Sequence, residues 1–422
     1  MLKKLLGCLG VSVLLSSMAF SGELKVNFDQ MDVSAKDFVR AEIADIIPAP
    51  EPEQTVKDWT IMVYVNAKNN LERFGLIDLN EMEMVGSTDR VNVVAELGRK
   101  AGYDSSDGDW MGSRRYLVKK DDNFSAITSP VVQEIAKTDM GDYMHLAEFG
   151  KWAKENYPAK HYMLVVWNHG SGWNKKRFDF SPTGISYDDE TGNHITTPQL
   201  GMALKEIGGV DVYGSDACLM QMPEVDYEIM PYADYIVGSE ETEPGDGYTY
   251  NTFLGPIAEN PGMTPEEVGR VAVNAYADHY QQQNEGTTQS LIRSAELIRF
   301  IPLLNDWTSA VMKANDTTLV KSAKNSAQDY AVYDNKDLYH FVQLINAGTL
   351  DAAVAEKGKA LMSFIENDLV SLNRTVTSQY DNSHGIAIYL PGWSFNSSYD
   401  QLAWAKDTQW DEFAKWVISI RE

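Results

Sequence analysis

The sequence predicts an α/β fold in which helices cover both faces of a mostly parallel sheet. Continuous apolar runs of strand length recur along the chain, as expected for strands that are buried on both faces. Segments with apolar residues at helical spacing separate these runs, and this alternation implies right-handed crossovers between parallel strands. The chain has 422 residues, 44% of them hydrophobic, and is too long for one compact core, so we expect two or more subdomains.

The predicted strands are five apolar runs in the N-terminal part of the chain and one near its end. The N-terminal runs cover residues 60–65, 91–97, 161–167, 209–213 and 235–238. Residues 385–391 form the last run, and we expect it to return to the main sheet.

Helices are predicted between the strands and over most of the C-terminal part. Residues 71–85 and 143–156 have apolar side chains at helical spacing. Another helix begins at Thr197, where a cap residue precedes a proline. A capping box opens a helix at Thr264, and helical stretches follow to about Leu372. The C-terminal part is therefore predicted to be a helical elaboration of the sheet and not a free domain.

The first residues have the pattern of a secretory signal peptide. Lys3 and Lys4 precede an apolar stretch that is too short for a membrane span, and we expect cleavage before Gly22. Residues 22–57 are charged, end in a cluster of prolines, and are predicted to be a pro-segment or an N-terminal strap. We therefore expect a soluble, exported protein, periplasmic or extracellular, from a bacterial source.

The formal net charge of −25 argues against two classes of partner. Nucleic acid and anionic membrane surfaces carry negative charge themselves and would repel so acidic a chain. A solvated acidic surface explains most of this charge, which would also mildly attract cationic peptides. No apolar run after the leader is long enough to span a bilayer. The sequence leaves the oligomeric state open.

Polar clusters follow three of the predicted strands. The strand at 161–167 leads into His169 and Gly170, the next one ends in Asp216 and Cys218, and the fifth opens into residues 239–248. In open parallel sheets, ligands bind beyond the carboxyl ends of the strands. We therefore expect a histidine, a cysteine and several carboxylates to converge on one edge of the sheet.

Cys218 is the one cysteine outside the leader, which contains Cys8. A lone thiol cannot form an internal disulfide, so it is a buried apolar side chain, an intermolecular cross-link or a nucleophile. Its position after a strand and shortly before a predicted helix start near Pro223 favours the nucleophile. A helix N-terminus lowers the pKa of a nearby thiol.

His169 is the predicted partner of this thiol. A satisfied core histidine is the alternative, but Gly170 and Gly172 beside it allow close backbone approach. The imidazole could protonate a leaving amine or assist the thiol, and the Gly170 amide could donate to a developing oxyanion. We therefore predict a cysteine–histidine dyad.

These residues carry a family resemblance. Residues 167–173 and 216–220 are similar to the clostripain-type cysteine peptidases, which are relatives of caspases, gingipains and legumain. Weaker matches flank them, so the resemblance runs from about Trp59 to Phe413. Cys218 also follows His169 by about 50 residues, the spacing quoted for caspases.

The resemblance implies a caspase–hemoglobinase fold and cleavage of protein or peptide substrates after arginine or lysine. His169 would be the general acid/base, Cys218 the nucleophile, and the backbone amides of Gly170 and Cys218 the oxyanion donors. The predicted division of the chain is then a signal peptide at 1–21, a pro-segment or strap at 22–57, a caspase-like catalytic core at 58–255 and a helical C-terminal subdomain at 256–422.

Asp216 and Asp246 are the predicted ligands of the basic side chain. Asp216 lies two residues before the nucleophile, and Asp246 lies in the glycine-rich loop after the next strand. Paired around a guanidinium, they would make short charge-assisted hydrogen bonds. A turn-capping role is the alternative for Asp216, and the loop of Asp246 contains other acids, Glu240, Glu241 and Glu243.

Two further family traits stay open. The basic cluster Lys175, Lys176 and Arg177 is either an activating self-cleavage site or a solvated loop. Residues 104–109 are acidic enough to bind calcium but lack the spacing of a full calcium loop. No cofactor is therefore expected to be required, and calcium is the single candidate.

Taken together, these features predict a secreted cysteine endopeptidase that cleaves after arginine or lysine through a Cys218 thioester acyl-enzyme. The alternative is a non-catalytic exported binding or envelope protein on the same fold, with tyrosines and tryptophans at its binding surface. A metallohydrolase is disfavoured, because the chain has no paired-histidine motif and too few cysteines for a zinc cluster.

Overall fold

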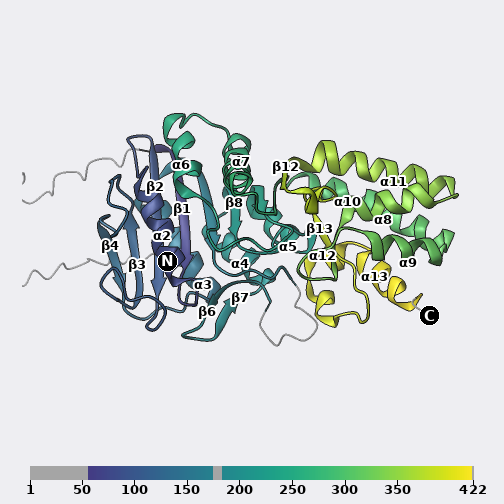
Figure 1. Ribbon diagram of the computed structural model, residues 1–422, viewed down its shortest axis with the longest axis horizontal. Helices are drawn as coiled ribbons and strands as arrows, with labels where there is room; N and C mark the ends of the chain where they lie inside the picture. Colours follow the sequence, from purple (N-terminus) through teal and green to yellow (C-terminus); the bar gives the residue numbers. More distant parts are fainter. Residues whose placement is uncertain (1–55, 174–182, 421–422) are drawn as a thin grey trace, which may run out of the picture. The chain divides into compact units, whose positions relative to one another are not determined.

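The computed structural model of this protein describes residues 56–173 and 183–420 (Figure 1). The expected signal peptide, nearly all of the expected pro-segment, and the cluster Lys175, Lys176 and Arg177 lie outside the described residues. Lys57, the last residue of the expected pro-segment, is instead the first residue of strand β1 (Lys57–Asn66).

The described part of the chain is built on a sheet of nine strands, in the order β12-β10-β9-β8-β5-β1-β2-β3-β4. Besides β1, these strands are β2 (Val91–Arg99), β3 (Gly112–Leu117), β4 (Val131–Ile135), β5 (Ala159–Trp167), β8 (Val210–Asp216), β9 (Ala233–Gly238), β10 (Thr287–Arg293) and β12 (Val370–Val376). The five inner strands are parallel, and antiparallel pairs extend the sheet at both ends. The predicted fold class is therefore confirmed.

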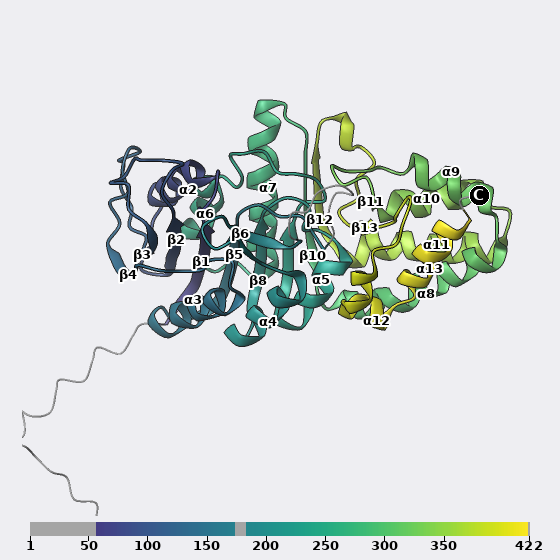
Figure 2. The ribbon, with the colours of Figure 1, turned by 90° about the horizontal axis from the view of Figure 1, so that it is seen from below.

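Both faces of the inner sheet are buried. Its five strands are therefore continuous apolar runs, which is why they could be predicted from the sequence. Along β1, Ile61 and Val63 pack into one apolar cluster, whereas Met62 and Tyr64 pack into another on the opposite face. Figure 2 shows the helices that cover these faces. One face carries α2 (Glu72–Glu83), α6 (Tyr250–Glu259) and α7 (Pro265–Gln283), and the other carries α3 (Tyr143–Asn156), α4 (Thr197–Ile207) and α5 (Pro223–Ile229).

The C-terminal part is mainly helical, as predicted. Its helices are α8 (Glu296–Ala314), α9 (Thr317–Ser326), α10 (Leu338–Gly348), α11 (Ala352–Phe364), α12 (Ala403–Asp407) and α13 (Trp410–Ser419). Their apolar side chains belong to the same cluster as those of α3, α4 and α5, so this part shares a core with the sheet. None of the described helices is long and apolar enough to cross a membrane.

The expectation that residues 385–391 return to the main sheet is wrong. Within that run, β13 (Ala387–Tyr389) pairs with β11 (Asn335–Asp337) in a separate two-stranded antiparallel sheet. Its apolar side chains are buried in the cluster formed with the C-terminal helices. The C-terminal part enters the main sheet through β10 and β12 instead. The domain boundaries near residues 58 and 256 stay a prediction.

Candidate active site

Four strand-end segments meet around one cavity of about 100 Å³ at the carboxyl edge of the parallel strands. They are the segment after β1, the ends of β5 and β8, and the loop after β9. The lining residues are Leu71, Trp167, Asn168, His169, Asp216, Ala217, Cys218, Glu243, Pro244, Gly245 and Gly247. The structure thus brings His169, Cys218 and Asp216 together at one sheet edge, where the strand ends place them.

Gly170 allows the histidine and cysteine segments to touch. A Cβ at Gly170 would lie 2.5 Å from the carbonyl oxygen of Cys218 and 2.9 Å from the Ala217 Cβ, so a side chain does not fit there. The next residue, Ser171, donates its N–H to the Gly184 carbonyl at 3.0 Å, which holds the same segment from the other side. The backbones of Gly170 and Cys218, the two predicted oxyanion donors, are therefore in direct contact.

The His169 imidazole is held in one tautomer by Asn70. Its Nε2 lies 2.7 Å from Asn70 Oδ1. Because an amide oxygen only accepts, Nε2 carries the proton and Nδ1 is the free acceptor of the ring. Burial lowers the pKa of His169, against a smaller opposing effect of the Asp189 charge. The imidazole is therefore neutral at neutral pH and able to take up a proton.

Asn70 was not singled out in the sequence, although it lies only four residues after the end of β1. Its segment is tied to the hairpin of β6 (Ile185–Asp188) and β7 (Asn193–Ile195). Asn69 Nδ2 donates to the Tyr187 carbonyl at 2.8 Å, and the buried Lys68 Nζ lies 2.6 Å from Glu190 Oε2. The run of polar residues that follows β1 was the signal that could have identified this segment as a fourth contributor to the site.

The Cys218 thiol is covered by the backbone of Glu243. The Glu243 N–H donates to Sγ at 3.3 Å, and the thiol donates to the Glu243 carbonyl at a long 3.9 Å. Burial raises the pKa of Cys218 to about 11, and the Glu243 charge adds to this effect. The expectation that a helix N-terminus lowers this pKa is therefore wrong. Helix α5 begins only at Pro223, and burial among acids dominates.

Asp216 presents a buried carboxyl to the cavity. Its Oδ1 accepts from the Tyr248 N–H at 3.1 Å, and its Oδ2 accepts from the Tyr250 hydroxyl at 2.8 Å. A Cβ at Gly247 would lie 2.6 Å from Oδ1, so the glycine-rich loop packs directly on the carboxyl. Burial raises the pKa of Asp216 to about 7, although these hydrogen bonds oppose the shift.

Asp246 is not brought into this cavity. Its side chain is 59% exposed, and its Oδ2 lies 3.9 Å from His279 Nε2. The second carboxyl among the lining residues belongs to Glu243, from the same loop. The sequence alone identifies Glu243 only as an acid near Asp246, because residue order does not show which side chains of a loop point inward.

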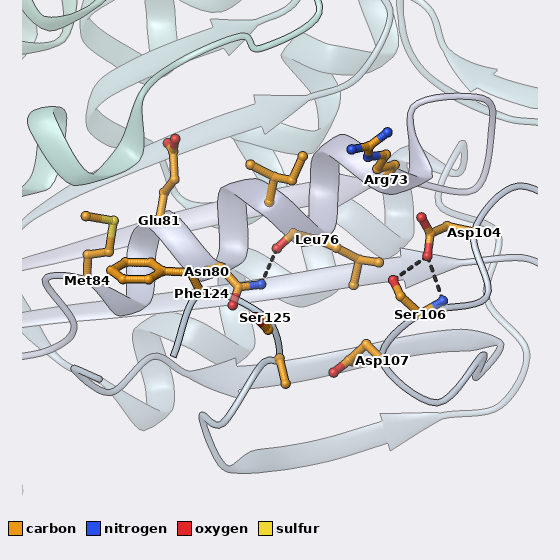
Figure 3. A pocket seen from close by; sticks show the side chains of 12 residues that line it. Arg73, Leu76, Asn80, Glu81, Met84, Asp104, Ser106, Asp107, Phe124 and Ser125 are labelled. Atoms are coloured by element: carbon orange, nitrogen blue, oxygen red, sulfur yellow. Dashed lines mark hydrogen bonds between the residues drawn. The ribbon is translucent and has the colours of Figure 1, made fainter. Parts of the chain in front are cut away.

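The acidic segment 104–109 borders a different cavity, of about 540 Å³, alongside α2 (Figure 3). Asp104 Oδ1 accepts from the Ser106 N–H at 2.7 Å, and Asp107 Oδ2 accepts from the Trp110 indole at 3.2 Å. Within residues 56–173 and 183–420, no three His, Cys, Asp or Glu side chains are grouped so that they could hold a metal ion. Calcium binding stays a prediction.

Comparison with known proteins finds a family whose matched range includes all of these residues. The model of the clostripain family matches residues 63–416 of this chain. Clostripain from Hathewaya histolytica is 30% identical over 230 residues, which are 49% of this chain and 44% of that protein. The chain therefore matches less than half the length of this curated relative.

Two solved structures share the fold. One is a secreted C11 cysteine protease from Bacteroides thetaiotaomicron in complex with an irreversible peptide inhibitor, at 22% identity and a TM-score of 0.63. The other is an inactive zymogen C11 protease from Parabacteroides distasonis, at 20% identity and a TM-score of 0.65. Each comparison covers 85% of this chain and 99% of the other. At these identities the likeness shows the fold.

Replacement of Gly170 by alanine is expected to lower the free energy of unfolding by about 1–3 kcal/mol, because the added Cβ forces the two segments apart. Urea unfolding measures this change. Gly255→Ala in α6 is the matched control, since its Cβ would meet nothing within 4 Å and alanine favours a helix. An unchanged stability of Gly170→Ala would contradict the packing described for this contact.

The raised pKa of Cys218 predicts a slow reaction with small alkylating agents. At pH 8 a thiol with a pKa of about 11 is almost entirely protonated, so iodoacetamide should react about two orders of magnitude more slowly than with free cysteine. Mass spectrometry of the intact protein gives the rate, and the same protein in denaturant is the control. A native rate equal to the denatured one would contradict the burial of this thiol.

Proposed function

This chain belongs to the clostripain family of cysteine peptidases, and from that premise we propose that it is an exported endopeptidase that cleaves peptide bonds after arginine or lysine. The observation that carries this proposal is the single cavity lined by His169, Cys218 and Asp216. A base, a nucleophile and a buried acid in one small cavity suit thiol-dependent cleavage next to a cationic side chain. The leader pattern at 1–21 supports the exported location.

In the first half of the reaction, Cys218 is the nucleophile and His169 is the base. The sulfur attacks the scissile carbonyl carbon while its proton moves to His169 Nδ1. The carbonyl electrons collect on the oxygen, to which the Gly170 and Cys218 amides donate. When the intermediate collapses, the C–N bond breaks and the imidazolium gives its proton to the leaving amine. A thioester remains on Cys218.

In the second half, water resolves the thioester. His169 removes a proton from the water as its oxygen attacks the thioester carbonyl. The C–S bond then breaks, the peptide leaves as a carboxylic acid, and the proton returns to the sulfur. Cys218 and His169 are both neutral before the substrate arrives, because burial disfavours the thiolate and the imidazolium. This resting state suits the cycle.

A non-catalytic exported binding protein on the same fold is the second candidate, and one observation favours it. The Glu243 backbone covers the thiol, whose pKa is raised to about 11. A binding protein needs no reactive thiol. A peptidase with this site must instead move the proton to His169 during attack. Removal of the thiol separates the two candidates.

Cys218→Ala and His169→Ala are each expected to lower kcat/KM on peptides with arginine or lysine before the scissile bond by about a thousandfold or more. Fluorogenic peptides ending in Arg, Lys, Asn or Asp measure the activity and its preference. Circular dichroism and thermal unfolding of each variant check that the fold is kept. Full activity of Cys218→Ala would rule out a cysteine peptidase.

Asn70 has a positioning role in this proposal. Its Oδ1 accepts the Nε2–H of His169 at 2.7 Å and so keeps Nδ1 as the acceptor that takes the thiol proton. The segment that carries Asn70 is anchored by Asn69 and Lys68, so the amide does not have to be ordered when substrate binds.

Asn70→Ala is expected to lower kcat about tenfold with little change in KM, because the tautomer is no longer held. Asn70→Asp keeps an acceptor, and its carboxylate would raise the pKa of His169. Since the base must be neutral, the acid limb of the kcat/KM profile should then move to higher pH. Asn156→Ala, at the end of α3 and exposed, is the control. An unmoved acid limb in Asn70→Asp would reject the role.

A further inference from the structure

The cavity beside Cys218 contains two carboxyl groups, and only one of them was expected. Asp216 comes from the end of β8 and Glu243 from the loop after β9. Asp246, the second acid that the family resemblance implied, faces His279 and is largely exposed. The geometry therefore separates two acids of one loop, one inside the cavity and one outside it.

The hydrogen-bonding capacity of the Glu243 carboxyl group is only partly used. Its Oε1 accepts from Gln289 Nε2 at 3.4 Å, and its buried Oε2 has no hydrogen-bond partner among the described residues. The Asp216 carboxyl lies in the same cavity, and its charge adds to burial in raising the pKa of Glu243. In the part of the chain that the structure describes, neither acid forms a salt bridge with lysine, arginine or histidine. A buried carboxylate without a cationic partner has a high free energy, which a bound cation would lower.

The groups that face this pair add no positive charge. The segment from β8 to the loop after β9 contributes Cys218, Glu241 and Asp246, and α2 contributes Asp78 and Glu81. The other groups are phenols: Tyr248 just before α6, Tyr250 in α6, and Tyr276 and Tyr280 in α7. All of these are acids, phenols or the thiol. His169, which lines the same cavity from the end of β5, is neutral at neutral pH because burial lowers its pKa. The histidine near Asp246, His279, lies on α7. The electrostatic field at the pair therefore favours a cation.

Building on the proposed function, we propose that Glu243 is a specificity-determining residue, the second carboxylate that receives the arginine or lysine side chain beside Asp216. A guanidinium between the two carboxylates would satisfy Glu243 Oε2 and make charge-assisted hydrogen bonds to both acids. The same residue covers Cys218 with its backbone, so the group that recognises the substrate is also the one next to the nucleophile.

In the empty pocket the pair keeps a proton. Two neighbouring buried carboxyl groups repel each other when both are ionised, and burial raises the pKa of both, that of Asp216 to about 7. A cation binds best when both acids are ionised, so it displaces this proton. Affinity for a guanidinium should therefore rise with pH through the neutral range and level off once the empty pair is deprotonated.

Isothermal titration calorimetry of the full chain tests this without requiring turnover. The probe is n-propylguanidinium, which has the atoms of an arginine side chain, and uncharged n-propylurea is its matched control. Titration at pH 8, above the pKa of Asp216, in two buffers of different ionisation enthalpy gives the number of protons released. We expect the wild type to bind the guanidinium and not the urea, with release of close to one proton.

Glu243→Gln should weaken this binding about tenfold or more and abolish most of the proton release, because the amide shares no proton with Asp216. Glu259→Gln, an exposed acid at the end of α6, controls for net charge and should bind as the wild type does. Asp246→Asn should also stay close to the wild type. Comparison of Glu243→Gln with these two variants isolates the role of the cavity carboxylate.

Three results would overturn the assignment. They are no binding to the wild type, wild-type binding and proton release in Glu243→Gln, and a larger loss in Asp246→Asn than in Glu243→Gln. A chain that binds the guanidinium through Glu243 but hydrolyses no peptide would keep this inference and reject the proposed function. The experiments therefore distinguish a wrong assignment of the guanidinium pocket from a wrong assignment of peptidase activity.

Discussion

The site depends on the backbone contact at which Gly170 lies against the carbonyl oxygen of Cys218. Strands β5 and β8 are parallel neighbours, so their carboxyl ends are adjacent, but side chains at this point would hold the two segments apart. Glycine removes that obstacle, and the histidine of one segment then borders the same cavity as the cysteine of the other. The other groups are arranged around this contact. The segment after β1 orients the imidazole, and the loop after β9 covers the thiol.

Burial governs the protonation of the groups at this site. It raises the pKa of the Cys218 thiol and of the Asp216 carboxyl, and it lowers the pKa of the His169 imidazole. We infer a resting site with a neutral thiol, a neutral imidazole and a proton shared between two carboxyl groups. A cationic substrate side chain would supply the charge that this site lacks. Recognition of the substrate and ionisation of the pocket would then be coupled.

Local patterns in the sequence predicted the inner strands and the meeting of their polar ends, because both follow from apolar runs and chain direction. The four outer strands, β3, β4, β10 and β12, were missed, since polar residues interrupt their apolar runs. In β3 the buried Arg115 forms an ion pair with Glu96 of β2, a pairing that only the folded sheet reveals. The roles of Asn70 and Glu243 also needed the structure, because they depend on side-chain direction. The helix effect expected at Cys218 was outweighed by burial, which a sequence does not state.

The central claim is that Cys218 is a nucleophile placed next to a pocket for a basic side chain. Its most direct test is covalent labelling with two peptide chloromethyl ketones that differ only in carrying arginine or citrulline next to the reactive group. Peptide mapping by mass spectrometry locates and times the adduct. The account predicts one adduct, on Cys218, that forms much faster with the arginine reagent and is absent from Cys218→Ala. Equal rates for the two reagents, or an adduct that forms elsewhere, would contradict it.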